Sequence, residues 1–267
     1  MGDFASQEEI AAATAYENLY VPALFQQWAP RILDRAQVRP GHRVLDIACG
    51  TGILAREAAS RMRGEGSVAG LDANPGMLAV AKRLDPTIDW REGVAESLPY
   101  EDNSFDVVVS QFGLMFFEDR STALREMIRV LAPGGRIAAS VWESLENSEA
   151  YPAEVALLER IAGSQAADAV RAPFVLGDRS ELATLFKDAG VTSVEITTHR
   201  GTARFPSIRV MVEADLRGWL PVMGVVLSEE QIECILDEAE HDLRRYVTPQ
   251  GNMTFDSPAH IVTGSKS

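Results

Sequence analysis

The stretch Val44-Leu45-Asp46-Ile47-Ala48-Cys49-Gly50-Thr51-Gly52 decides the fold of this chain, together with Gly70-Leu71-Asp72 about twenty residues later. The first stretch has the pattern of an apolar strand, a tight glycine turn and the start of a helix. The second has the pattern of a strand that ends in a carboxylate. In open α/β sheets, ligands bind outside the carboxyl ends of the parallel strands. The two stretches therefore predict a nucleotide-type cofactor site at that edge of a sheet.

Two cofactors fit this glycine turn. The residues Gly50-x-Gly52-x-x-Ala55 match the dinucleotide fingerprint, with Asp72 placed to bind ribose hydroxyls. S-adenosylmethionine (SAM) also carries a ribose and an adenine, but it has a sulfonium and an ammonium instead of a pyrophosphate. The carboxylate of Asp46, just before the turn, would repel a pyrophosphate on the helix N-terminus and attract a cationic methionine end. Either ligand needs glycine here, because a side chain would block close approach of the backbone. The residues favour SAM.

Further segments follow in the order of a known family. The turn resembles motif I of the class I SAM-dependent methyltransferases, and Gly70–Asp72 resembles their second-strand acidic motif. The segments Arg91–Pro99, Phe105–Leu114 and Arg129–Gly135 resemble the family's acidic loop, its fourth-strand motif and the turn before its fifth strand. The resemblance covers roughly residues 40–143. Within the family, the chain most resembles the broad group of small-molecule methyltransferases that includes the ubiquinone/menaquinone C-methyltransferases.

The resemblance implies a Rossmann-like three-layer α/β sandwich, with a seven-stranded, mostly parallel sheet, an antiparallel last strand and a helical cap. Val94 departs from the family, which often has an aspartate there that accepts a hydrogen bond from the adenine amino group. Apolar packing on the adenine and a backbone contact at Ala95 are expected instead. The residues expected to bind SAM are Asp46, Ala48, Gly50, Gly52, Asp72, Ala73, Met77, Gly93, Val94, Ala95 and Gln111.

The composition is that of an acidic globular protein. Of 267 residues, 46% are hydrophobic, and 39 acidic against 25 basic residues give a formal net charge of −14. Nucleic acid and anionic membrane surfaces are disfavoured as partners, because both require a basic face. Cys49 and Cys234 indicate no disulfide framework. Since neither a signal-peptide pattern nor a membrane-length apolar run is present, a cytoplasmic protein is expected.

We expect a single methyltransferase domain over residues 1–267. Its core comprises about residues 37–143, 178–200 and 255–267, and its cap or lid comprises about residues 1–36, 144–177 and 201–254. The expected strands are residues 43–47, 67–71, 88–91, 105–110, 136–142, 191–198 and 259–265. The expected helices are residues 7–36, 52–62, a helix opening at Asn74-Pro75, and residues 120–131, 152–162, 180–189 and parts of 206–246.

Several local signals refine these boundaries. Pro22 should kink or break the first helix, and Pro133-Gly134-Gly135 should end the helix before the fifth strand. Ser180 is expected as a helix cap, and the segment after the helix at residues 152–162 is expected as a loop. Ser228–Gln231 is a capping box. The apolar stripe that follows it fits a helix packed on the core, a homodimer face or a substrate lid, and its position favours the lid.

Methyl transfer from a sulfonium needs positioning and desolvation more than a strong catalytic group. The apolar segment after the fourth strand predicts a small acceptor that is hydrophobic or aromatic, although some of its residues could equally pack a helix on the sheet. The candidate acceptor or lid residues are Tyr20, Phe25, Phe112, Met115 and Trp142. No acidic cluster indicates a metal. Among the histidines only His241 is a candidate base, and a solvated surface histidine is the competing interpretation.

Three functional hypotheses follow. The first is a SAM-dependent methyltransferase that acts on a small hydrophobic or aromatic molecule. The second is an NAD-dependent oxidoreductase, which Asp46 and the downstream motifs oppose. The third is a non-catalytic SAM-binding protein of the same fold. The identity of the acceptor, and whether oxygen, nitrogen or carbon is methylated, stay open at this point.

Overall fold

A computed structural model describes residues 5–267 of the chain; residues 1–4 of the predicted cap lie outside the described residues. Contacts divide the chain into two compact units. The first contains residues 5–141, Asp178–His199 and His260–Ser267, and the second contains Trp142–Gly177 and Arg200–Ala259. The N-terminal segment, which the sequence analysis assigns to the cap, thus groups with the first unit. The description as a single domain with a core and a cap stays a prediction.

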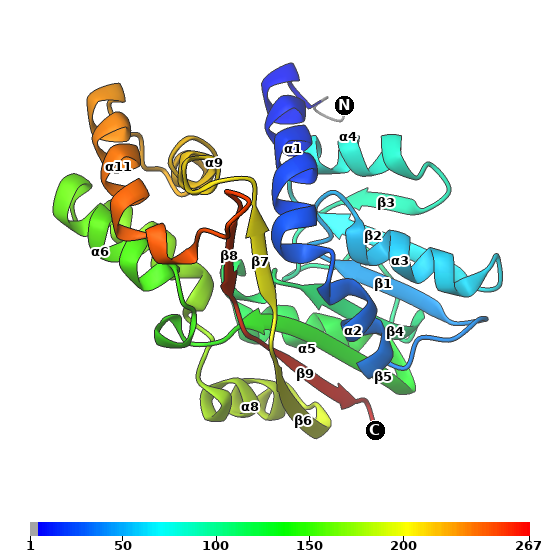
Figure 1. Cartoon of the computed structure of the whole chain (residues 1–267). Helices are drawn as coiled ribbons and strands as arrows, with labels where there is room; N and C mark the ends of the chain where they lie inside the picture. Colours follow the sequence, from blue (N-terminus) through cyan, green and yellow to red (C-terminus); the bar gives the residue numbers. More distant parts are fainter. Residues whose placement is uncertain (1–4) are drawn as a thin grey trace. The chain divides into compact units, whose positions relative to one another are not determined.

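The first unit is built on a seven-stranded sheet with the order β3-β2-β1-β4-β5-β9-β6 (Figure 1). Its pairs β1–β2, β1–β4, β2–β3 and β4–β5 are parallel. Strands β1 and β4 are buried over nearly their whole length, which explains their continuous apolar runs. The strands are β1 (Arg43–Ile47), β2 (Ser67–Asp72), β3 (Asp89–Glu92), β4 (Phe105–Gln111), β5 (Leu131–Trp142), β6 (Thr192–His199) and β9 (Ala259–Ser265).

The last strand, β9, runs antiparallel to β5. The N–H of Gly134, near the start of β5, donates to the carbonyl of Lys266 just after β9, at 3.0 Å. The N–H of Glu143, just after β5, donates to the carbonyl of Pro258 just before β9, at 3.1 Å. Residue numbers therefore rise along one strand as they fall along the other. The predicted fold class, including its antiparallel last strand, is confirmed.

Helices lie on both faces of this sheet: Figure 1 shows α2 and α3 in front of it and α5 behind it. The side chain of Asn74 accepts a hydrogen bond from the N–H of Met77 at 3.1 Å, so the predicted cap with Pro75 at the first helical position is confirmed. The helices are α2 (Trp28–Arg35), α3 (Ile53–Met62), α4 (Pro75–Leu84), η2 (Leu114–Phe116), α5 (Arg120–Val130) and α8 (Arg179–Asp188).

The N-terminal helix α1 (Gln7–Tyr20) ends in a π-helical turn, η1 (Val21–Phe25). Pro22 supplies no N–H to a helical ladder, and its ring crowds the preceding turn. The N–H of Gln26 instead donates to the carbonyl of Val21, five residues back, at 2.8 Å. The predicted break at Pro22 is confirmed, and it redirects the chain into α2.

The second unit joins helices to a two-stranded antiparallel sheet of β7 (Thr202–Phe205) and β8 (Met253–Asp256). This pair escaped the sequence analysis because each strand is only four residues long. The loop predicted after Ala162 was wrong, since Ser164–Arg171 forms helix α7 with its alanines buried. The remaining elements are η3 (Leu145–Asn147), α6 (Tyr151–Ala162), η4 (Ala172–Phe174), α9 (Ile208–Ala214), η5 (Asp215–Trp219), α10 (Leu220–Val222), α11 (Glu229–Asp242) and η6 (Arg244–Tyr246).

Two further boundaries differ from the predictions, and one is confirmed. Helix α5 already ends at Val130, and Pro133-Gly134-Gly135 lies inside β5 as a bulge, where the pairing with β4 shifts register. Asp178, rather than Ser180, caps α8, because its carboxylate accepts from the N–H of Ser180 at 2.7 Å. The predicted capping box of α11 is present at Ser228 and Gln231.

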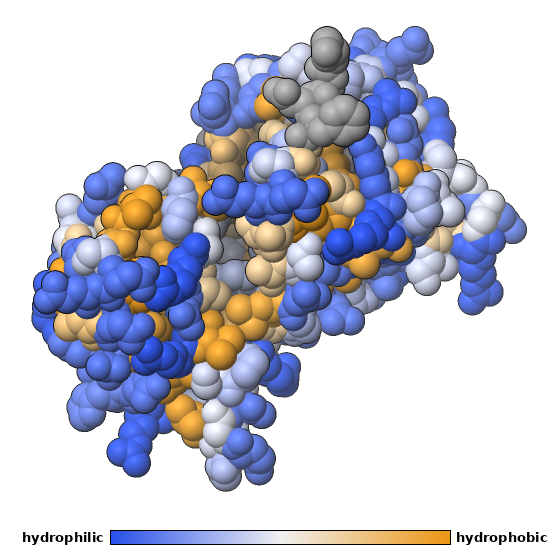
Figure 2. All heavy atoms as spheres, turned by 90° about the horizontal axis from the view of Figure 1, so that it is seen from above, coloured by the Kyte–Doolittle hydropathy of each residue, from blue (hydrophilic) through white to orange (hydrophobic). Residues whose placement is uncertain are grey.

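Charged side chains cover much of α11. Arg217 donates to Glu229 at 2.7 Å, and Arg160 pairs with Glu238. Hydrophilic residues accordingly dominate the left part of Figure 2, where this helix lies.

Within residues 5–267, no helix is long and apolar enough to cross a membrane.

Candidate active site

The glycine turn between β1 and α3 is closed by backbone hydrogen bonds to the end of β2. The N–H of Cys49 donates to the carbonyl of Leu71 at 3.0 Å, and the N–H of Gly50 donates to the Asp72 carboxylate at 2.7 Å. Ala48 has a positive φ of 54°, which is uncommon outside glycine. The turn is therefore a fixed shape that the two adjacent strands hold in place.

The two glycines of the turn serve different purposes. A Cβ on Gly50 would meet nothing within 4 Å, so it would project into open space, as expected where a ligand approaches the backbone. A Cβ on Gly52 would lie 2.3 Å from the indole of Trp90, and this glycine has a φ of +89°. Ligand approach is the reason expected from the sequence for both glycines, and it stays a prediction. At Gly52, close packing on Trp90 and the backbone conformation already require glycine.

Asp46, at the carboxyl end of β1, is almost completely buried, with 1% of its surface exposed. One carboxylate oxygen accepts from the N–H of Ala55 in α3 at 3.1 Å, while Oδ1 has no donor among the described residues. Burial raises the pKa of Asp46 well above its usual range; the Ala55 hydrogen bond opposes this rise, and the charge of Asp72 adds to it. A cation beside Oδ1 would stabilise the ionised form.

Asp72 joins the two loops that flank the site. Its carboxylate accepts from the N–H of Gly50 at 2.7 Å and from the N–H of Asn74 at 2.8 Å. Desolvation raises the pKa of Asp72, and these backbone hydrogen bonds counteract it. Ala73 follows it and is exposed, and Met77 lies half-buried in the first turn of α4. This arrangement places a carboxylate between the glycine turn and the N-terminus of α4.

The loop after β3 carries the other predicted cofactor residues. The N–H of Gly93 donates to the carbonyl of Asp72 at 3.1 Å, which ties this loop to the end of β2. Val94 exposes 49% of its surface, whereas Ala95 is buried. An exposed valine next to a nucleotide-type site offers an apolar face that an adenine ring could cover.

Strand β4 ends at the polar residue Gln111, and a strained aromatic residue, Phe112, follows it. The side-chain amide of Gln111 donates to the carbonyl of Phe25 at 3.3 Å, and its Oε1 is buried without a donor among the described residues. Phe112 has a φ of 55°, which is an outlier for a bulky residue. Its N–H donates to the carbonyl of Ser140 on β5 at 3.1 Å. Strain of this kind is found at functional sites, where the surrounding structure maintains it.

An aromatic cluster surrounds Phe112. Its ring centroid lies 5.6 Å from that of Phe25 and 5.7 Å from that of Trp28. Tyr16 stacks on Phe25 at 5.5 Å and contacts Tyr20 at 5.8 Å. The structure thus brings together the predicted Tyr20, Phe25 and Phe112. Tyr16 was missed, although its position four residues before Tyr20 on one helix face was a usable signal.

The predicted Met115 is buried in η2, with 3% of its surface exposed. Trp142, the last residue of β5, belongs to the second unit and is also largely buried. Its assignment to the acceptor site stays a prediction.

The family model of a methyltransferase domain matches residues 45–139 of the chain. The ubiquinone/menaquinone biosynthesis C-methyltransferase of Cupriavidus pinatubonensis is 36% identical over 198 residues, which cover 67% of this chain and 79% of that protein. The chain belongs to the class I SAM-dependent methyltransferases. SAM is therefore its cofactor, and the dinucleotide hypothesis is not favoured.

Other relatives of this methyltransferase match over less of their length. The demethylmenaquinone methyltransferase of Renibacterium salmoninarum is 41% identical over 115 residues, which cover 43% of this chain and 47% of that protein. The chain thus spans about half the length of several curated relatives that it matches. A solved structure, a putative methyltransferase from an antibiotic biosynthesis pathway of Anabaena variabilis, agrees in fold with a TM-score of 0.66 at 16% identity, covering 90% of this chain and 96% of that one.

The buried polar atoms of the methyltransferase fit SAM. Two of the buried atoms left without a donor at the carboxyl ends of β1 and β4 are Oδ1 of Asp46 and Oε1 of Gln111. Both are acceptors, as an ammonium group requires, whereas a pyrophosphate would need donors. The open space over Gly50 and the exposed Val94 complete a surface for a small nucleoside.

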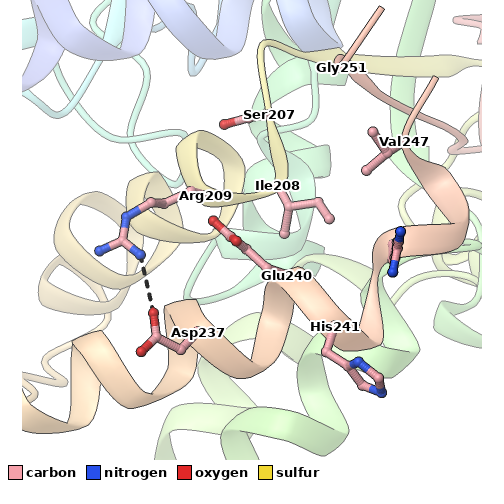
Figure 3. A pocket seen from close by; sticks show the side chains of 9 residues that line it. Ser207, Ile208, Arg209, Asp237, Glu240, His241, Val247 and Gly251 are labelled. Atoms are coloured by element: carbon pink, nitrogen blue, oxygen red, sulfur yellow. Dashed lines mark ion pairs between the residues drawn. The ribbon is translucent and has the colours of Figure 1, made fainter. Parts of the chain in front are cut away.

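His241, the candidate base, is exposed on α11 in the second unit of the methyltransferase. It lines an open groove of about 480 Å³, together with Arg209, Asp237 and Glu240. Arg209 and Asp237 form an ion pair at 3.5 Å, and His241 points away from Glu240 (Figure 3). No partner that would orient the imidazole is found among the described residues of the groove, and its role as a base stays a prediction.

Proposed function

We propose that this methyltransferase transfers a methyl group to a ring carbon of a small, flat aromatic acceptor of the quinol type. The observation that carries the proposal is the aromatic cluster at the carboxyl end of β4. Its rings come from α1, η1, α2 and the strained Phe112, and the adjacent Gln111 carries one of the unpartnered acceptors. Flat apolar walls beside a few polar groups are typical of sites for aromatic ligands. The ubiquinone/menaquinone relatives support the same acceptor class.

The proposed roles of the chain's residues are binding and orientation. Asp46 and Gln111 accept hydrogen bonds from the ammonium of the cofactor, and Asp72 accepts from its ribose hydroxyls. Phe25 and Phe112 exclude water and hold the acceptor ring in one plane. SAM, when bound, supplies a methyl group on an already activated sulfonium. The proposal therefore needs no metal and no strongly activated nucleophile from the protein.

We further propose a cytoplasmic enzyme that does not bind nucleic acid. The net charge of −14 supports the second part, because it opposes phosphate-rich partners, and two cysteines with no disulfide framework support the first. The homodimer proposed from the apolar stripe of α11 has less support, since Ile232, Ile235 and Leu236 on that stripe are buried within the unit itself.

Turnover with defined acceptors tests the proposal. The purified chain is incubated with SAM and, separately, a demethylmenaquinol, a catechol and a primary amine, and the products are analysed by mass spectrometry. We expect a C-methylated product from the quinol only. Methylation of the catechol oxygen or of the amine, with an unmodified quinol, would contradict the proposed acceptor class.

A further inference from the structure

Arg56 of α3 makes two contacts in different directions. One guanidinium nitrogen donates to the carbonyl of Thr51 in the glycine turn, and the other donates to the Glu17 carboxylate on α1 at 2.7 Å. The side chains of Arg56 and Glu17 expose only 19% and 17% of their surfaces. This is not a solvated surface pair, whose net contribution is small. It connects the N-terminal helix to the backbone of the cofactor turn.

A second contact fixes α1 to helix α4, on the other side of the site. A Cβ on Gly76, in the first turn of α4, would lie 2.6 Å from the carbonyl oxygen of Glu9 in α1. The backbones of the two helices therefore touch. Helix α1 is held to α4 at Gly76 and to α3 through Arg56. Helix α3 follows strand β1, which carries Asp46, and α4 follows strand β2, which carries Asp72.

Tyr16 brings α1 close to Asp72. Burial raises the pKa of Tyr16, and the charges of Asp72 and Glu17 add to that rise, so the phenol lies within electrostatic range of the Asp72 carboxylate. The second oxygen of Glu17 is buried and has no donor among the described residues.

We propose that Glu17 and Arg56 are positioning residues for the cofactor: their bridge fixes the orientation of the Thr51 peptide between Gly50 and Gly52, and so couples the docking of α1 to SAM binding. Because the Thr51 carbonyl belongs to the turn, releasing it loosens the backbone next to Gly50, where a Cβ would meet no protein atom. A guanidinium can donate along two fixed directions at once, whereas a lysine presents a single point charge. The inference rests on the proposed placement of the cofactor at this turn.

The test compares binding of S-adenosylhomocysteine by calorimetry and its dissociation rate by stopped flow, in the full chain. The variants are Arg56→Lys, Glu17→Ala and Glu17→Gln. Arg61→Lys is the matched control, because Arg61 also bridges α3 to neighbouring groups, donating to Asp34 at 2.5 Å and to the carbonyl of Pro30 at 3.0 Å, without touching the turn.

We expect Arg56→Lys and Glu17→Ala to weaken binding about tenfold, with most of the change in the dissociation rate. Glu17→Gln keeps an acceptor oxygen and should recover most of the affinity, and Arg61→Lys should bind as the wild type does. Unchanged binding by folded Arg56→Lys and Glu17→Ala, or an equal loss in Arg61→Lys, would overturn the inference. Failure of the wild-type protein to bind would instead contradict the proposed cofactor site itself.

Discussion

The carboxylate of Asp72, at the end of β2, accepts a hydrogen bond from the backbone N–H of Gly50 at 2.7 Å. A residue at the end of β2 thereby holds the turn that follows the adjacent strand β1. The same carboxylate accepts from the N–H of Asn74 at the start of α4. Asp72 therefore acts on both loops before any ligand arrives. We propose that its contribution to cofactor binding has two parts: the shape of the turn and a contact with the ribose.

Replacing Asp46 by Asn should stabilise the protein without cofactor and weaken SAM binding. The pKa of Asp46 is raised by burial, so the folded state keeps a proton that the unfolded chain releases above about pH 3.8. The contribution of this proton to the free energy of unfolding is fully present below that pH and is lost as pH rises toward the pKa of the folded state. An asparagine has no titrating proton, so the melting temperature of the Asp46→Asn variant should exceed that of the wild type by a few degrees at alkaline pH.

Calorimetry of the same pair checks the functional half of this prediction. Wild-type affinity for SAM should rise with pH through the raised pKa of Asp46, because the cation needs the carboxylate, and the Asp46→Asn variant should lack this part of the pH dependence. Identical pH profiles for the two proteins would show that Asp46 does not contact the cationic end.

The glycines of the turn should respond differently to alanine. Gly52→Ala should unfold readily, since strain at positive φ costs about 1–2 kcal/mol and the overlap with Trp90 costs about a further 1–3 kcal/mol. Gly50→Ala meets no protein atom, so it should fold with a smaller loss of stability but bind SAM poorly. Urea unfolding and calorimetry separate the two. Equal loss of stability in both variants would refute this division of roles.

Phe112→Leu should lower kcat/KM for the acceptor while leaving the affinity for S-adenosylhomocysteine within about threefold of wild type, because the ring is proposed to line the acceptor site rather than the cofactor turn. Phe105→Leu is the matched control, since it removes a buried ring from the other end of β4, where Tyr100 packs on it at 5.0 Å. Its kinetics should be those of the wild type. A kinetic defect as large in Phe105→Leu would assign the effect to the strand's stability.

Much of the first unit could be predicted because its signals are local. Asp46, the glycine turn and Asn74 each sit at a junction whose shape depends on neighbouring residues. The pairing of Thr202 with Asp256 joins two segments that are distant in sequence, and four-residue strands carry too little periodicity to reveal it. The left-handed conformation of Phe112 could not be predicted either, because it is maintained by Ser140 on another strand.

The second unit contains a buried pair of carboxyl groups, Glu154 on α6 and Asp215 in η5. Burial raises the pKa of Glu154 well above its usual range, and the charge of Asp215 adds to the rise. The folded state thus keeps a proton that the unfolded chain loses above about pH 4.5. Stability from this pair should fall as pH rises from there toward the folded pKa.

Glu154→Gln removes the titrating carboxyl group beside Asp215 and keeps a side chain of nearly the same size and shape. The difference in melting temperature between the variant and the wild type should therefore grow in favour of the variant as pH rises from about 5 to about 9. Differential scanning calorimetry across this range measures it. Two parallel curves would mean that the pair is already ionised in the folded protein.

The most direct test of the account is a calorimetric titration of the chain with S-adenosylhomocysteine, repeated with NAD⁺ and with the Asp72→Ala variant. We predict one site with micromolar affinity for S-adenosylhomocysteine, no binding of NAD⁺, and a loss of about tenfold or more in the variant, since hydrogen bonds to a charged acceptor contribute about 1.5–3 kcal/mol each. No binding of S-adenosylhomocysteine by the folded wild-type chain, or equal binding by Asp72→Ala, would contradict the assignment of the glycine turn as the cofactor site.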